Sequence, residues 1–171
     1  MRFAKIFELF CKRLNQGTEL TVALLLAATI VVTLLQVVFR YGVDSSLSWS
    51  EELARYLFIW LIFLGSACAV RRGQHMAVDT LVLLAPLSLR RPLKMLVLAV
   101  SSCFFGVVLY TGLLLTQNAL YQTSAALEIS VAAVYIAAPI GAILALIHLL
   151  NGLVQLAAIG STLVHITTDI S

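Results

Sequence analysis

The stretch from Leu53 to Val70 constrains this chain most, because its eighteen residues include a single charged side chain, that of Arg55. At about 1.5 Å per residue, a helix of this length crosses a hydrocarbon layer roughly 30 Å thick. We therefore expect a membrane-spanning helix over residues 51–71.

Both ends of this helix carry signals of direction. Ser48 and Glu51 have the spacing of a capping box, and Glu51 stands four residues before Arg55, the favourable order for an ion pair. Arg71, Arg72 and His75 follow at the carboxyl end, where the helix dipole favours cations.

Composition extends this conclusion to the whole chain. Hydrophobic residues make up 61% of the 171 and charged residues only 11%, whereas a soluble domain is about a quarter charged. Such a chain lacks the polar surface of a water-soluble or nucleic-acid-binding domain. We expect one all-α integral membrane domain over residues 1–171 with four transmembrane helices, the other three at about residues 20–39, 93–116 and 131–158.

Two shorter apolar segments are predicted to lie at the membrane surface. Residues 2–14 place Phe3, Phe7 and Phe10 at helical spacing among basic residues, which is typical of an amphipathic interfacial helix. Residues 76–89 are too short to span and contain Asp79 and Pro86. A signal peptide is disfavoured, because residues 20–39 exceed a typical signal core and no A-x-A-like site follows.

The distribution of Lys and Arg predicts the orientation. Four spans place nine basic residues on the side of the termini and the second link, and only Arg40 and Arg55 on the other. By the positive-inside rule, both termini are expected in the cytoplasm of a bacterium, with the chain in its inner membrane.

Small residues mark the predicted helix contacts. Ala133, Ala137, Gly141 and Ala145 recur every four residues, and Gly65 with Ala69 repeats this spacing. Such rows let helix backbones approach closely, either within this chain or toward a partner. Pro139 is expected to kink the fourth span, since it cannot donate a hydrogen bond to the carbonyl of Tyr135.

Polar residues near one membrane edge form the best candidate cluster. Arg40 ends the first span, and Glu51, Glu52 and Arg55 begin the second. We expect an interhelical ion-pair cluster of these four residues; separate snorkelling of the two arginines is the alternative.

Enzyme chemistry is not indicated. Cys11, Cys68 and Cys103 lack the paired spacing of a thiol oxidoreductase. His148 has no second histidine at membrane depth for bis-histidine haem ligation, so a core histidine hydrogen-bonded to a neighbouring helix is the favoured interpretation. A proton-coupled drug exporter would need an acidic residue deep in a span, whereas Glu19 lies at an edge. No cofactor or metal is expected.

The centre of the chain resembles the small membrane subunit of tripartite ATP-independent periplasmic (TRAP) transporters. The resemblance rests on a set of residues between positions 39 and 79. These are Phe39-Arg40-Tyr41, Trp49-Ser50-Glu51-Glu52-Leu53-Ala54-Arg55-Tyr56, Trp60, Phe63-Leu64-Gly65, Arg71-Arg72-Gly73, His75 and Val78-Asp79. Trp49, Trp60, Gly65, Arg71, His75 and Asp79 thereby join the candidate structural or interface residues.

This resemblance implies a role in secondary transport. A periplasmic substrate-binding protein would capture an organic acid anion, and a large multi-span subunit would move it with sodium. The small subunit would be a scaffold for the large one, surrounded by membrane lipids. The alternative is a membrane anchor subunit of a quinone- or haem-linked redox enzyme.

Overall fold

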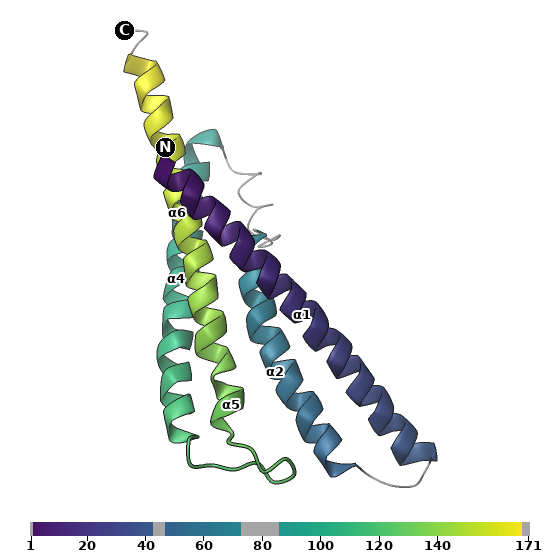
Figure 1. Ribbon diagram of the computed structural model, residues 1–171. Coiled ribbons are helices and arrows are strands. Elements are labelled where there is room, and N and C mark those ends of the chain that lie inside the picture. The colour runs from purple at the N-terminus through teal and green to yellow at the C-terminus, as the bar shows by residue number, and fades with distance from the viewer. Residues whose placement is uncertain (1, 43–46, 73–85, 169–171) are drawn as a thin grey trace.

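The computed structural model describes residues 2–42, 47–72 and 86–168, and all of its long elements are helices (Figure 1). They are α1 (Arg2–Gly42), α2 (Ser48–Arg71), α4 (Leu87–Asn118), the short α5 (Ala132–Tyr135) and α6 (Ala137–Thr168). Four stretches are long and apolar enough to cross a membrane, namely Ile6–Gly42, Ser48–Arg71, Pro92–Asn118 and Ala132–Val154, the last of which runs through α5 into α6. The expected all-α membrane fold with four spanning helices is confirmed.

The four long helices form an open row rather than a closed four-helix bundle. Along the row α1 packs on α2, α2 on α6, and α6 on α4, whereas α4 contacts neither α1 nor α2 within the described ranges. Half of the apolar stretch that runs through α5 and α6 is buried, and none of that in α1. The core therefore follows α6, with Ala67 of α2, Phe105 of α4, and Ala142, Ala145 and Leu149 of α6 at its centre.

The row of helices has two distinct ends. The amino end of α1 and the carboxyl ends of α2 and α6 lie at one end, here called the terminal end (Figure 1). The opposite end, here called the hairpin end, carries the start of α2 and the link between α4 and α5. Both described ends of the chain thus lie on the same side, as an even number of spans requires.

The predicted surface helix at residues 2–14 is not a separate element. It continues without a break into the first span, so that α1 has 41 residues and a length of about 60 Å at ~1.5 Å per residue. This exceeds a hydrocarbon layer of roughly 30 Å, and α1 runs obliquely across α2 to reach α6 near the terminal end (Figure 1). The second expected surface segment, residues 76–89, lies mostly outside the described residues; α4 begins at its end, at Leu87.

Threonines within α1 show how an apolar helix accommodates hydroxyl groups. The hydroxyls of Thr18, Thr21, Thr29 and Thr33 each donate to the carbonyl four residues earlier, over 2.7–3.0 Å. A threonine whose hydroxyl is hydrogen-bonded in this way presents its methyl group to the surroundings and leaves no donor unpaired. The threonines therefore leave the surface of α1 largely apolar.

The predicted kink at Pro139 appears as an interruption between α5 and α6. Helix α5 ends at Tyr135, Ile136 forms a turn, and α6 begins at Ala137. Proline has no amide hydrogen to continue the ladder toward Tyr135, and its ring crowds that carbonyl. The structure thus shows an interruption of the helix three residues before the proline, in the region where the kink is expected.

Candidate functional site

The link between α4 and α5 folds into a small hairpin, residues 119–131, at the hairpin end. Thr123 and Ser130 form an antiparallel bridge. The amide of Ser124 donates to the carbonyl of Ile129 and that of Val131 to the carbonyl of Gln122, both over 2.9 Å. Glu128 closes the turn with a φ of 54°, in the left-handed region.

Glu52 of α2 holds this hairpin through its turn. Its Oε2 accepts the amide hydrogens of Ala126 and Leu127 over 2.9 and 3.1 Å, and its Oε1 accepts the phenol of Tyr56 over 2.5 Å. Charge-assisted hydrogen bonds of this kind are stronger than neutral ones, and they satisfy amides at the membrane edge. We call Glu52, Tyr56 and the turn 124–128 the Glu52 clamp.

The expected cluster of Arg40 with the acidic residues is only partly present. Glu51 and Arg55 form the predicted pair, 3.3 Å apart, with both side chains about two-thirds exposed. Arg40 is exposed, and no hydrogen bond or ion pair joins it to Glu51, Glu52 or Arg55 in the part of the chain that the structure describes. The hairpin amides, not the guanidinium of Arg40, are the partners of Glu52.

The predicted capping box is wrong. Helix α2 starts at Ser48, its N-cap residue is Leu47, and no side chain caps its first turn. Instead, the buried Ser50 hydroxyl donates to the carbonyl of Leu47 over 2.7 Å. Because the helix begins earlier than the box requires, Ser48 lies inside it and cannot act as the cap.

Trp60 links α2 to the helix interruption. Its indole N–H donates to the carbonyl of Ala133 in α5 over 3.1 Å. Carbonyls beside a proline break in a membrane helix commonly find such partners on neighbouring helices. Trp49, by contrast, is 40% exposed at the hairpin end.

One of the two small-residue rows packs within the chain. A Cβ on Gly141 would lie 2.6 Å from the carbonyl oxygen of Phe63, so α6 touches the backbone of α2 there. Ala137 and Ala145 of the same row are fully buried. Gly65, in the second row, faces open space, since a Cβ there would meet nothing within 4 Å.

Glu19 and Arg72 join α1 to α2 toward the terminal end. Arg72 donates from Nε and Nη2 to Oε1 of Glu19 over 3.0 and 2.8 Å, and Asn15 donates to the same oxygen over 2.8 Å. Sequence reasoning missed this pair, because it treated Glu19 only as a possible coupling residue. The available signal was that antiparallel spans bring the start of the first apolar run level with the end of the second.

Four polar residues singled out by the sequence remain, and two of them lie within the described residues. Arg71 is half-buried, while His75 and Asp79 lie outside the described residues. His148 is only 5% exposed. The expected hydrogen bond to a neighbouring helix is not found at its Nδ1, which has no partner among the described residues.

The described residues show no assembled metal site. No three His, Cys, Asp or Glu side chains are gathered as ligands in those ranges. Of the three free thiols, those of Cys11 and Cys68 are buried and that of Cys103 is exposed. The geometry is that of helix packing and loop attachment.

Comparison with known proteins decides the family. Residues 29–158, well over half of the chain, match the family of tripartite ATP-independent periplasmic transporters, DctQ component. This chain belongs to the DctQ family. The Glu52 clamp, the Trp60 contact and the Gly141 contact all lie within the matched region.

Individual relatives agree with this assignment. The chain is 29% identical to the C4-dicarboxylate TRAP transporter small permease protein DctQ of Vibrio cholerae, over 61% of this chain and 47% of that protein. It is 33% identical to the protein of the same name from Rhodobacter capsulatus, over 56% and 43%. It is 32% identical to the sialic acid TRAP transporter permease protein SiaT of Haemophilus influenzae, over 78% and 22%.

These matches establish the family of the chain and cover only part of each relative. The chain spans less than half the length of each of these three relatives. DctQ proteins are permease components of transporters and not enzymes. This chain is a multi-pass membrane protein of the DctQ family, and the relatives from Vibrio cholerae and Rhodobacter capsulatus are named TRAP transporter small permease proteins.

Proposed function

We propose that this DctQ-family chain is a scaffold for the large subunit of a sodium-coupled TRAP transporter and does not itself bind the transported ion or substrate. The supporting observation is the kind of polar residue that is buried. Within the described ranges these are Asn15, Thr18, Ser50, Ser124, His148 and Asn151, with no carboxylate among them. Sodium prefers oxygen ligands such as carboxylates and unwound backbone carbonyls near the middle of the membrane.

The shape of the molecule supports the same role. A row one helix thick leaves apolar side chains exposed on α1, α2 and α4, for example Leu34, Phe58 and Phe104. Membrane helices associate through close packing, so such faces suit lipid and a large multi-span partner equally. The scaffold would present one long side to that partner.

The class of substrate follows from the relatives. C4-dicarboxylates and sialic acid, named in two groups of relatives, are both organic acid anions. We propose an organic acid anion as the substrate, delivered by a periplasmic binding protein to the large subunit. The redox-anchor alternative is not favoured, because the matching family consists of transporter components.

Reconstitution tests this division of labour. The purified chain alone in liposomes should give no sodium-dependent uptake of radiolabelled succinate or sialic acid, even with a matching periplasmic binding protein outside. Liposomes that also contain the large subunit of the same transporter should take up the substrate of that system. Uptake by the chain alone would contradict the scaffold role.

A second arm tests the need for the scaffold. The large subunit alone should lose most of its uptake and recover it when this chain is added. Full uptake by the large subunit alone would also contradict the proposal.

A further inference from the structure

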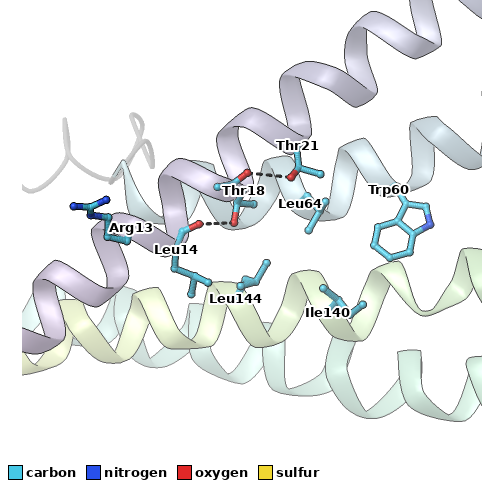
Figure 2. A pocket seen from close by; sticks show the side chains of 9 residues that line it. Arg13, Leu14, Thr18, Thr21, Trp60, Leu64, Ile140 and Leu144 are labelled. Carbon is cyan, nitrogen blue, oxygen red and sulfur yellow. Dashed lines mark hydrogen bonds between the residues drawn. The ribbon is translucent and has the colours of Figure 1, made fainter.

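A groove lies where α1 crosses α2 and α6. Its volume is about 440 Å³, within the range of roughly 300–1,000 Å³ of small-molecule sites. Helix α1 contributes one wall, and α2 and α6 form the other side (Figure 2). It is lined by Arg13, Leu14, Gly17, Thr18, Thr21, Trp60, Leu64, Ile140 and Leu144.

The wall of this groove offers almost no free polar group to an occupant. The hydroxyls of Thr18 and Thr21 donate to carbonyls of their own helix, and the indole N–H of Trp60 donates to Ala133. The remaining wall residues apart from Arg13 are aliphatic or glycine. An occupant must therefore be apolar along most of its length.

Arg13 supplies a charge at one end of the groove, with Trp60 toward the other (Figure 2). The Arg13 side chain is exposed and has no hydrogen bond or ion pair within the described ranges. It stands seven residues before Leu20, where the expected hydrocarbon span begins. That separation is about 10 Å along a helix, which places the guanidinium at the depth of lipid headgroups.

We propose that this groove binds one anionic phospholipid from the leaflet at the terminal end. An acyl chain would lie between α1 and α6, and the phosphate would contact Arg13. The apolar wall of the groove suits an acyl chain, and Arg13 suits the phosphate. Guanidinium groups bind phosphate through two parallel hydrogen bonds, and basic pockets between membrane helices bind anionic headgroups. The lipid would fill the space that opens as α1 diverges from α6.

A helix of a partner protein is the other possible occupant, and charge complementarity favours the lipid. Among the described lining residues the one cation, Arg13, lies at an end of the groove and not beside an apolar helix face. A long apolar chain with one terminal anion satisfies both the wall and Arg13. This inference does not depend on the transport role proposed above.

Native mass spectrometry of the full chain, released from mild detergent, tests the proposal. The delipidated chain is titrated with phosphatidylglycerol and, in parallel, with phosphatidylethanolamine of the same acyl composition. Wild type should retain one phosphatidylglycerol more strongly than phosphatidylethanolamine. Arg13→Gln should weaken phosphatidylglycerol binding about fivefold, from roughly 1 kcal/mol per basic residue at the membrane surface.

Lys12→Gln is the matched control for charge. Lys12 is exposed on the same turn but does not line the groove, so its substitution removes no contact with the bound phosphate and should change binding by less than about twofold. Equal losses in the two variants would mean general surface attraction only and would overturn the site.

Gly17→Leu tests the groove itself. A Cβ on Gly17 meets nothing within 4 Å, so leucine can enter the groove without a backbone clash. This variant should lose the retained lipid while its thermal unfolding in detergent stays close to wild type. Gly106→Leu is the control, because Gly106 of α4 is equally open and lies outside the groove.

Thr21→Leu provides a second filling variant if Gly17→Leu fails to fold. Unchanged lipid retention in a folded groove-filling variant would overturn the proposal. The same result combined with loss of copurification with the large subunit would assign the groove to a partner helix.

Discussion

Glu52 connects two parts of the chain that are more than seventy residues apart. Its carboxylate accepts from Tyr56, four residues along α2, and from the amides of Ala126 and Leu127 in the hairpin. Glu51, its neighbour, makes only an exposed pair with Arg55. Two adjacent carboxylates thus have different structural roles, because one faces the hairpin and the other faces away.

We expect Glu52→Ala to loosen the hairpin without unfolding the helices. Loss of the shared acceptor leaves the amides of Ala126 and Leu127 with weaker partners, so their hydrogen exchange should accelerate by about tenfold or more. Exchange mass spectrometry of peptides covering residues 119–131 measures this.

Glu51→Ala is the control for that experiment, since it removes an adjacent carboxylate that does not touch the hairpin. Its exchange profile over the hairpin should match that of wild type. If Glu52→Ala also left the hairpin protected, the clamp would not hold it in place.

The packing of the core depends on the contact between helices α2 and α6. Gly141 brings the α6 backbone onto Phe63, while Ala67 and Ala145 fill the layer beside it. A second close approach joins α4 to α6, where a Cβ on Gly112 would lie 2.9 Å from Cδ of Pro139. Helix α6 can contact both neighbours because small residues face each of them.

Gly141→Ala should destabilise the fold by about 1–3 kcal/mol, the usual range for inserting a methyl group into a closed contact. The neighbouring atoms at Gly141 belong to backbone and cannot move aside easily. Unfolding in mixed micelles with increasing SDS measures the change.

Gly65→Ala is the matched substitution, because a Cβ at Gly65 meets nothing. Its stability should stay within about 0.5 kcal/mol of wild type. Equal effects of the two substitutions would show that the α2–α6 contact is not closed as described.

For the whole molecule, the open row and the even number of spans place both described ends of the chain on one side. The basic residues follow the same division, since nine lie on the side of the termini and two on the other. We propose on this basis that the terminal end is cytoplasmic and the hairpin end periplasmic.

Cysteine labelling in intact cells tests this orientation, in a variant with Cys11, Cys68 and Cys103 replaced. Tyr121→Cys lies in the hairpin, where Tyr121 is 95% exposed, and it should react with an impermeant maleimide added outside. Lys12→Cys, exposed at the terminal end, should react only after permeabilisation. The reverse pattern would overturn the assigned orientation.

The sequence by itself determined the class of the protein and the number of spanning helices. Apolar runs of this length can satisfy their backbone hydrogen bonds in lipid only as helices, so Leu53–Val70 and its counterparts needed no tertiary information. Pro139 likewise predicted the α5–α6 break, because a missing amide hydrogen is a local property. The Glu51–Arg55 pair was predictable for the same reason, as its spacing lies within one helix.

Only the tertiary structure decided which distant groups meet. Glu52 is bound by hairpin amides, and Glu19 by Arg72, because helix packing and a turn with a left-handed Glu128 place those donors there. Amides carry no side-chain signature, so the sequence suggested Arg40 instead. The packing of α1 across α2 and α6 also made residues 2–14 part of one long helix and opened the groove beside Arg13. Such contacts depend on the relative positions of several helices, which local hydrophobic periodicity does not encode.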